Sequence, residues 1–412
     1  MNQTLHGSNI FSVKAHNLQA VLLSLLYSEK LSRTELAEQI NLSSTTITNL
    51  ITELLEEGLV SESDCDDAES DHNRPVGRPR KALCLEPNAR FVIGVHVGVG
   101  TFRIALTNLR NEIIASYLAS FDLQEDPLQV IDQIIEDIDS LIAESQTDRN
   151  LILGVGIGLS GLVDFETGVN VLAPNLNWRH VPVKALMTSR LGMPIVADNN
   201  VRCMALGEAY FGMGRGVSSL AFVYGRIGVG AGFIYQGQVF RGSSMGAGEI
   251  GHTTLLLRGG EPCRCGKKGC LETLVSETAF LDQAQEIAQR HPAGILAEVI
   301  EENPNQNLMD NIVKSARQGD DSVREMLADR ANYLGIALAN MVDLYNPEMI
   351  ILGGLFAQAG DYFIGPLKET VQKMSFGDLG NQVRIEVTDF GWKAGVIGAA
   401  ALALTHLFYL SD

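Results

Sequence analysis

A glycine-rich, strand–turn–strand pattern occurs twice in this chain and sets strong limits on its architecture. It spans residues 91–106, around Gly98, and again residues 220–234, around Gly228. Each copy joins two apolar runs through glycines, which accept the positive φ angles of a tight turn. Two such hairpins, each opening an α/β unit, predict two similarly built lobes with a cleft between them. Glycine turns can also let backbone N–H groups surround a phosphate, and a plain tight turn is the alternative.

Length and composition are those of a globular protein with more than one domain. The 412 residues predict roughly two to four domains, and 46% hydrophobic with 19% charged residues argues against wholesale disorder. The longest uninterrupted apolar stretch, Ala394–Leu404, is shorter than the roughly 20 residues that cross a bilayer. No export leader opens the chain. We therefore expect a cytoplasmic protein with no membrane partner.

Residues 1–87 predict a separate domain with three helices. Apolar residues at helical spacing mark the first helix around 18–26. Ser32 and Glu35 have the spacing of a capping box at the start of the second helix, and the third carries an apolar stripe over 47–55. This is the order of a helix-turn-helix, in which the second helix of the pair enters the DNA major groove.

Polar side chains on the third helix are suited to contact phosphates and base edges. The residues expected to contact DNA there are Ser44, Thr45, Thr48 and Asn49. Two wing strands are predicted, near residues 59–60 and at 81–85, with an acidic loop over 62–71 between them. After that loop, Arg78 and Arg80 lie in a proline-containing basic segment that suits an A·T-rich minor groove. A helical bundle used only for dimerisation is the alternative to this winged helix-turn-helix. The net charge of −18 does not exclude a DNA operator as partner, because a small domain would bind it.

Three cysteines, Cys263, Cys265 and Cys270, lie within one short loop that contains glycines. Together with His252 they can supply the four corners of a tetrahedron. Zn²⁺ favours Cys₃His sets, and four protein ligands leave no open position for catalysis. The sequence therefore predicts a structural zinc site, and unligated thiols beside a buried histidine are the alternative.

Two carboxylates, Glu249 and Glu272, flank the same cluster. If one imidazole nitrogen of His252 binds the metal, the other can donate a hydrogen bond to a ligand. Alternating acceptors and donors match the neighbouring hydroxyls of a sugar. These three residues therefore predict a sugar-binding site beside the metal. Neither a P-loop nor a Rossmann fingerprint is present, so those nucleotide-binding folds lose support.

At this point the chain resembles the ROK family (repressors, open reading frames and sugar kinases). The matching motifs are Glu249-x-Gly-His252, Cys263-x-Cys265-Gly-x-x-Gly-Cys270-x-Glu272, the segments 158–164 and 173–178, and Asn346-Pro347 running into Gly353-Gly354. The resemblance covers roughly residues 88–412 and implies a two-lobed, actin-like body of the sugar kinase and ribonuclease H type. It implies a first α/β lobe over 88–200 and a second over 201–412, with a carboxyl-terminal helix that returns to the first lobe. Members with an added helix-turn-helix are transcriptional regulators of the Mlc, NagC and XylR type.

The same resemblance indicates that the kinase chemistry is missing. Kinases of the family carry an aspartate in the first glycine hairpin and an Asn-Asp pair before a Gly-Glu, and here these places read His96 and Asn199-Asn200. An amide cannot accept the proton of a sugar hydroxyl, and histidine is a poor substitute for a carboxylate near Mg²⁺ and phosphates. Asn199 and Asn200 are therefore expected to bind sugar without catalysis. Asp198 is the one neighbouring carboxylate that could restore a base.

These expectations combine into a sugar-responsive repressor that has no enzyme activity. Its implied partners are a DNA operator, a sugar or sugar-phosphate effector, and further copies of the chain in a homodimer or homotetramer. Two alternatives remain open: an active ATP-dependent sugar kinase with a regulatory role, and a repressor controlled by a sugar-transport protein instead of free sugar.

Overall fold

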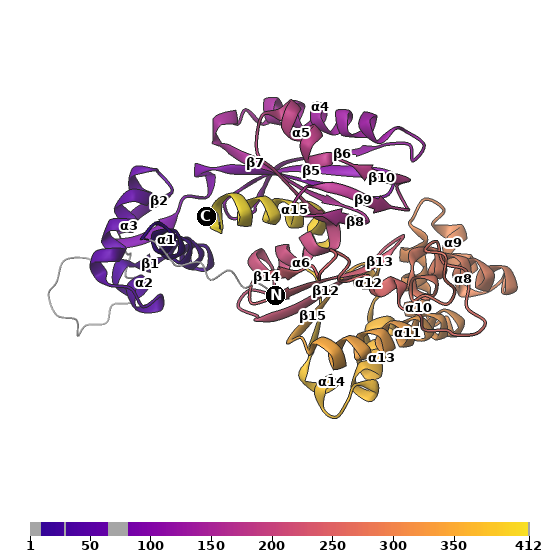
Figure 1. Cartoon of the computed structure of the whole chain (residues 1–412). Helices are drawn as coiled ribbons and strands as arrows, with labels where there is room; N and C mark the ends of the chain where they lie inside the picture. The colour runs from indigo at the N-terminus through magenta and orange to yellow at the C-terminus, as the bar shows by residue number, and fades with distance from the viewer. Residues whose placement is uncertain (1–9, 29, 65–80, 411–412) are drawn as a thin grey trace.

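The computed structural model of the chain describes residues 10–28, 30–64 and 81–410. The amino-terminal part is a small domain of helices and a three-stranded sheet, set to one side of the body (Figure 1). Its elements are α1 (Ile10–Tyr27), β1 (Leu31–Ser32), α2 (Arg33–Gln39), α3 (Ser44–Glu56), β2 (Val60–Asp64) and β3 (Lys81–Leu85), with strand order β1-β3-β2. The three predicted helices and the two wing strands are confirmed.

Side-chain caps explain where the second and third helices begin. The Ser32 hydroxyl accepts a hydrogen bond from the Glu35 amide, 3.2 Å away, and the Glu35 carboxylate accepts one from the Ser32 amide at 2.8 Å. This is the predicted capping box. Ser43 caps α3 by accepting from the amide of Thr46 at 3.1 Å. Because both caps satisfy amides that have no partner within the helix, the turn between α2 and α3 is set locally.

The acidic run begins inside the wing and not after it, so the prediction of a loop over all of residues 62–71 is wrong at its first residues. Strand β2 continues to Asp64 and pairs with β3, with Asp64 opposite Lys81. Glu62 lies 2.7 Å from the Arg33 guanidinium and 3.0 Å from the Lys81 ammonium. These cations hold the pKa of Glu62 below its usual value, through their hydrogen bonds to the carboxylate. The two cations compensate the negative charge of Glu62. That charge was part of the acidic run from which the sequence predicted a solvated loop.

The body contains two five-stranded sheets with the same topology. The first has β4 (Phe91–Val97), β5 (Thr101–Asn108), β6 (Ile113–Ser120), β7 (Ile152–Leu159) and β11 (Ile195–Asn199) in the order β11-β7-β4-β5-β6. The second has β12 (Ser219–Gly225), β13 (Val229–Tyr235), β14 (Gln238–Phe240), β15 (Met349–Gly354) and β16 (Arg384–Val387) in the order β14-β13-β12-β15-β16. In each sheet an antiparallel glycine hairpin, β4–β5 or β12–β13, is extended by two parallel strands. The two lobes predicted from the glycine repeats are confirmed.

Two buried helices, α6 (Asn200–Phe211) and α15 (Ala394–Leu404), lie between the sheets (Figure 1). Helix α15 packs on β4 and β7 of the first sheet and on α6. Glycines allow this close approach: a Cβ on Gly156 would lie 1.9 Å from the Ala399 carbonyl oxygen, and one on Gly207 would lie 3.1 Å from the Cα of Gly398. Among the described residues, one helical segment, Gly391–Tyr409, is apolar and long enough to cross a membrane. It occupies this core, and 67% of it is buried, as expected of a core helix in a folded domain.

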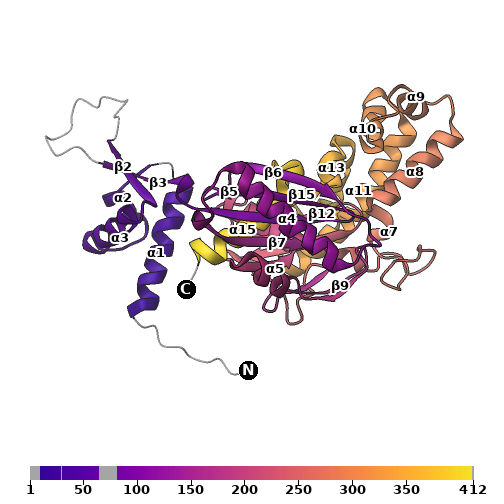
Figure 2. The ribbon, with the colours of Figure 1, turned by 90° about the horizontal axis from the view of Figure 1, so that it is seen from above.

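The remaining elements cover the outer faces of the lobes and carry the longer loops. The first lobe adds α4 (Pro127–Ser145), α5 (Val183–Leu191) and a small sheet of β8 (Leu162–Asp164), β9 (Val169–Ala173) and β10 (Trp178–Val181). The second adds α7 (Glu272–Val275), α8 (Glu277–Arg290), α9 (Ile295–Glu302), α10 (Leu308–Gln318), α11 (Asp321–Tyr345), α12 (Leu355–Gln358), α13 (Asp361–Met374) and α14 (Leu379–Gln382). The amino-terminal domain and helices α8–α10 lie at opposite ends of the molecule (Figure 2).

One hydrophobic core joins the amino-terminal domain to the body. Leu22 and Leu26 of α1 belong to the same buried cluster as Phe211, at the end of α6, and Tyr409, after α15. The Phe211 and Tyr409 rings lie 6.3 Å apart, and the Tyr409 hydroxyl donates to the Leu109 carbonyl at 2.7 Å. The small domain is therefore packed against the body and not merely tethered to it.

Candidate functional site

A cavity of ≈ 860 Å³ lies between the two lobes. Both lobes contribute to its wall, and the five residues predicted to bind sugar all line it: Asn199, Asn200, Glu249, His252 and Glu272. The first two stand where β11 passes into α6. Glu249 and His252 lie in the segment before the cysteine loop, and Glu272 is the first residue of α7, directly after that loop. Residues far apart in the sequence are thus brought to one concave site, the usual location of a small-molecule site in a two-lobed protein.

The two glutamates present acceptors on the side of the cysteine loop. Glu272 accepts a hydrogen bond from the Val229 amide at 3.0 Å, which ties the carboxylate to the second glycine hairpin. Burial raises the pKa of Glu249, the nearby Glu272 carboxylate adds to the rise, and His252 and Arg202 oppose it. A carboxylate with a raised pKa is incompletely solvated and gains from hydrogen-bond donors. Sugar hydroxyls are such donors.

The two asparagines have different local roles. Asn199 caps α6: its Oδ1 accepts from the amides of Val201 and Arg202 at 2.9 and 3.2 Å, and its Nδ2 donates to the Gly161 carbonyl at 2.9 Å. One amide hydrogen of Asn199 remains for a ligand. Asn200 is buried, and its Nδ2 lies 3.4 Å from both the His96 ring and the Ser160 hydroxyl. Its Oδ1 accepts from the Val201 amide at 3.0 Å, so both ends of the Asn200 amide already have partners within the protein.

His96 lies on the cavity wall next to Asn200. Burial, followed by the neighbouring Arg226 and Arg103 guanidiniums, lowers the pKa of His96 to about 4. The imidazole is therefore neutral at pH 7. A neutral ring among arginines does not offer the negative charge that a magnesium ion with phosphates requires.

Asp198 is not among the residues that line the cavity, so the structure gives no support to the idea that it could restore the base. It is fully buried, and its Oδ1 lies 2.6 Å from Arg202 while its Oδ2 lies 2.8 Å from Arg241. Arg241 comes from the second lobe, so the ion pair crosses between the lobes. Both carboxylate oxygens are paired with guanidiniums, which stabilise the ionised carboxylate inside the protein.

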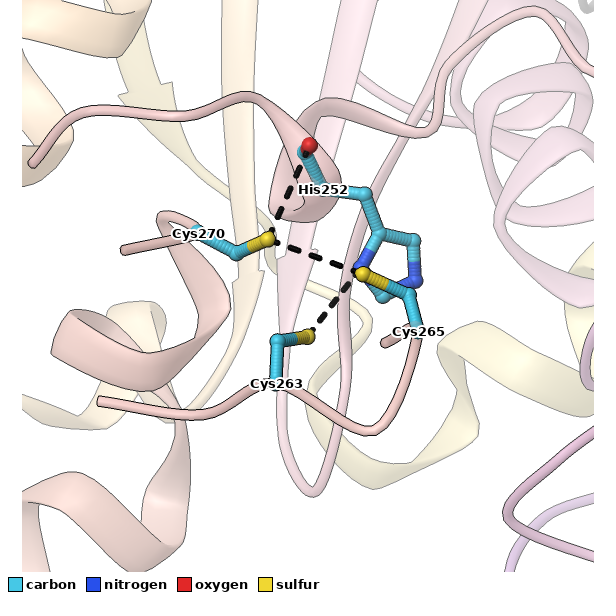
Figure 3. A group of neighbouring side chains, drawn as sticks. All are labelled: His252, Cys263, Cys265 and Cys270. Atoms are coloured by element: carbon cyan, nitrogen blue, oxygen red, sulfur yellow. Dashed lines mark hydrogen bonds between the residues drawn. The ribbon is translucent and has the colours of Figure 1, made fainter. Parts of the chain in front are cut away.

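The histidine and three cysteines converge at one point beside the cavity (Figure 3). All four ligand atoms lie within 4.8 Å of one another, with 3.6 Å between Cys263 Sγ and His252 Nδ1 and 3.6 Å between the sulfurs of Cys265 and Cys270. A tetrahedral ion with Zn–S bonds of about 2.3 Å and a Zn–N bond of about 2.0 Å gives S···S and S···N edges of about 3.8 and 3.5 Å. The four residues fit a tetrahedral metal ion. With Nδ1 toward the cysteines, Nε2 of His252 remains for a ligand.

The predicted DNA-contact residues on α3 share one exposed face. Ser44, Thr45, Thr48 and Asn49 are all exposed, while the opposite side of the helix is buried. The Thr48 hydroxyl donates to the Ser44 carbonyl at 2.8 Å, so its oxygen is left as an acceptor. Arg78 and Arg80 lie outside the described residues.

Asn175, Arg226 and Arg264 are among the cavity-lining residues that were not assigned from the sequence. The Arg264 guanidinium donates to Asn175 Oδ1 at 2.8 Å, across the two lobes. Arg226 lies in the second glycine turn, and a charged residue within that turn was the available sequence signal. Asn175 lies in the 173–178 segment that carries the family resemblance, but no periodicity points it toward the cavity.

Comparison with known proteins agrees with this architecture. Residues 92–406 match the ROK family, and residues 17–67 match the MarR family. A putative xylose repressor of Caldicellulosiruptor sp. (strain Rt8B.4) is 32% identical and aligns over 97% of this chain and 98% of its own length. A glucokinase of Halalkalibacterium halodurans is 31% identical over 76% of this chain and 94% of its own.

A solved structure of similar shape covers both the domain and the body. It is a ROK family transcriptional regulator described as a homolog of the Escherichia coli MLC protein. It is 26% identical, with a TM-score of 0.80, and the match covers 97% of this chain and 98% of that one. The predicted fold and the resemblance are both confirmed, and the chain belongs to the ROK family, with a MarR-type winged-helix domain at its amino terminus.

Proposed function

We propose that this protein is a sugar-responsive transcriptional repressor whose sugar pocket has no kinase chemistry. The observation that carries the proposal is the cavity wall: Asn200 and a neutral His96 stand together where the kinases of the family have carboxylates, and Asp198 is paired with two arginines. The repressor relative aligns over nearly all of this chain, whereas the glucokinase relative covers only 76% of it. A regulator that binds an operator has to share a compartment with the DNA, and we therefore propose a cytoplasmic location.

The metal is Zn²⁺ with a structural role, held by His252, Cys263, Cys265 and Cys270. Support comes from the soft sulfur ligands and the distances between ligand atoms, which fit a closed tetrahedral site. When bound, the ion cross-links the loop and orients the His252 ring. The free Nε2 of His252 then donates to a sugar hydroxyl, beside the acceptors of Glu249.

DNA is read by the exposed face of α3. Ser44, Thr45, Thr48 and Asn49 would contact bases and phosphates in the major groove, and Arg78 and Arg80 would enter the adjoining minor groove. Such domains read two half-sites, which requires a homodimer, or a homotetramer built from two dimers. The spacing between the two recognition helices then decides the affinity for the operator.

Helix α6 connects the cavity to the amino-terminal domain. It begins at Asn199 and Asn200 on the cavity wall and ends at Phe211, in the core shared with Leu26 of α1. Every residue of α6 is buried, so a movement of the lobes displaces it as a unit. A sugar can shift the equilibrium between two arrangements of the lobes only if it binds one arrangement more tightly than the other. We expect a coupling free energy of ~1–3 kcal/mol between sugar binding and operator binding.

The test is operator binding with and without sugars, measured by fluorescence anisotropy with the full-length protein. A sugar that binds the cavity should weaken operator binding by about 5- to 150-fold, the range of such couplings. Asn49→Ala should reduce operator affinity while leaving sugar affinity unchanged, and Glu249→Gln should do the reverse. Operator binding that no sugar or sugar phosphate alters would contradict the proposal.

Two other functions predict different results in the same experiments. A sugar kinase, favoured by the similarity to a glucokinase, predicts ATP-dependent turnover of a hexose or pentose in a coupled assay. A repressor controlled by a sugar-transport protein predicts release of the operator by that protein, with no response to free sugar.

A further inference from the structure

A second cavity, of ≈ 270 Å³, lies where the amino-terminal domain meets the body. Its wall combines α1, the turn between β5 and β6, the end of α6 with the residues after it, and α15 with the segment before it. The lining residues are Leu26, Arg110, Asn111, Glu112, Phe211, Arg215, Phe390 and Ile397. None of them lines the interlobe cavity. Ligand pockets usually measure about 300–1,000 Å³, so this one suits a ligand smaller than a nucleotide.

Two arginines of this wall have no acidic partner among the described residues. Arg110 is half-buried, and no residue in the described part of the chain accepts a hydrogen bond from its guanidinium or forms an ion pair with it. The Arg215 guanidinium donates to the Phe211 carbonyl at 2.8 Å, which orients it without neutralising its charge. Like charges in one cavity repel each other, and an anion bound between them removes that repulsion. The cavity therefore offers two positive charges to a ligand.

The turn that carries Arg110 is held in place by side-chain hydrogen bonds. Asn108 Oδ1 accepts from the amides of Arg110 and Glu112, each at 3.0 Å. Asn111 has a left-handed conformation, with a φ of 59°, and its Nδ2 donates to the Ile397 carbonyl of α15 at 2.9 Å. Because the turn is anchored to the core in this way, a ligand that binds it loses little affinity to ordering the chain.

Glu112 adds a hydrogen-bond acceptor to the same wall. Its Oε2 accepts from Asn108 Nδ2 at 2.7 Å, and no described residue donates to its Oε1. Within the described chain, neither Arg110 nor Arg215 forms an ion pair with this carboxylate. Two guanidiniums against one carboxylate leave the wall positive. A ligand that carries a hydroxyl beside its anionic group can therefore donate to Glu112 while the arginines bind the anion.

The position of the cavity connects a ligand to the DNA-reading domain. Leu26 of α1 forms part of the wall and belongs to the core that α1 shares with α6. Arg215 lies close to the end of α1: burial and the Tyr210 hydroxyl raise the pKa of Tyr27 to about 12, and Arg215 opposes that rise. An anion held by Arg110 and Arg215 joins the first lobe to the segment after α6. It stabilises the arrangement of domain and body that forms the cavity, and thereby shifts the population that can bind the operator.

We propose that this junction cavity binds a small phosphate monoester that carries a hydroxyl group, and that its occupancy changes the affinity for the operator. The phosphate would bind between Arg110 and Arg215, and the hydroxyl would donate to Glu112. A guanidinium forms two parallel charge-assisted hydrogen bonds with a phosphate, and a dianion matches two guanidiniums. The binding site is separate from the sugar pocket, and only its effect on the operator rests on the proposed function.

Binding is measured by isothermal titration calorimetry of the full-length protein, in a phosphate-free buffer of low ionic strength. The probes are glycerol 3-phosphate, methyl phosphate, inorganic phosphate and malate. Glycerol 3-phosphate should bind about 3- to 10-fold more tightly than methyl phosphate, which has no hydroxyl for Glu112. Arg110→Gln should weaken its binding about 10- to 100-fold through the loss of charge-assisted hydrogen bonds. Arg215→Gln should weaken it about 3-fold or more, a smaller effect because Arg215 is exposed.

The effect on DNA is measured by fluorescence anisotropy with the operator, with and without saturating glycerol 3-phosphate. The bound ligand should change operator affinity about 5-fold or more in the unmodified protein and leave it unchanged in Arg110→Gln. The response of Arg110→Gln to sugar should be kept, because Arg110 does not line the interlobe cavity.

A matched control separates the site from general charge effects. Arg290→Gln removes one exposed arginine of α8, where it pairs with Glu286, and should leave phosphate binding unchanged. Melting temperature and metal content of each variant show that the fold is kept.

Each outcome decides the question. If no phosphate binds, or if binding survives both arginine substitutions, the inference is overturned and the proposed function stands. Malate bound as tightly as glycerol 3-phosphate overturns the assignment to a phosphate. Binding that depends on the two arginines and leaves operator affinity unchanged overturns the link to DNA. Operator binding that no sugar alters contradicts the proposed function and not this site.

Discussion

Replacing Asp198 by Asn should destabilise the protein strongly, because it leaves buried arginine without compensation. Arg202 is 2% exposed and makes its ion pair with Asp198 at 2.6 Å, while Arg241 is 21% exposed and pairs with the other oxygen at 2.8 Å. Removing one partner of a buried pair costs about 3–5 kcal/mol, mostly the penalty of the charge left behind. The remaining bonds of Arg202, to the carbonyls of Met245 and Val163, do not neutralise its charge.

Two further variants test this reasoning. Arg241→Ala keeps the Asp198–Arg202 pair and removes only the partner from the second lobe, so we expect a smaller loss, about 1–3 kcal/mol. Asp139→Asn breaks an exposed pair with Arg149, both about half exposed, and should cost less than about 1 kcal/mol. The assay is urea unfolding followed by tryptophan fluorescence and circular dichroism, with the free energy of unfolding taken from the transition of the body.

The result that would refute the argument is a cost for Asp198→Asn no larger than that of Asp139→Asn. A stable Asp198→Asn variant that had lost an ATP-dependent sugar turnover would go further. It would show that Asp198 is a catalytic base and that the ion pair in the structure is not its working state.

Three other predictions follow from local geometry. Cys265→Ser should lose the metal, measured by elemental analysis, and weaken sugar binding with it; retained stoichiometric zinc would contradict the ligand assignment. Folding stability should fall as the pH drops from about 6.5 toward 4, by up to about 1.4 kcal/mol per pH unit, because the unfolded chain protonates His96 near 6.5 and the folded chain only near 4. His96→Gln should show a shallower fall in pH-dependent unfolding, and an identical profile would count against a neutral buried imidazole. Ser43→Ala should lower the stability of the amino-terminal domain by about 1 kcal/mol through loss of the α3 cap, seen in its thermal transition; no change would show that the cap is dispensable.

Helices, strands and the motif loops of this protein are encoded locally. The capping box at Ser32, the apolar stripe of α3 and the two glycine hairpins depend on residues close together in the chain, and each is found where the pattern predicts it. The same holds for the cysteine loop, since Cys263 and Cys270 are separated by a few residues with glycines between them. Short-range spacing therefore predicted the helix-turn-helix, the two similarly built lobes and the candidate metal-binding cluster, whereas the actin-like fold class was implied by the resemblance to the ROK family.

Tertiary structure alone decided what the neighbouring charged groups do. In the sequence, Asp198 and Asn200 are two residues apart, and either could have faced the cavity. The fold buries the carboxylate against Arg202 of the adjoining helix α6 and against Arg241, which is distant in the sequence, and leaves the amide beside His96. Likewise, Arg226 faces Gly98 only because two hairpins from separate sheets meet at the cavity. Contacts between residues distant in the chain depend on how the lobes pack, and periodicity along the sequence carries no information about that packing.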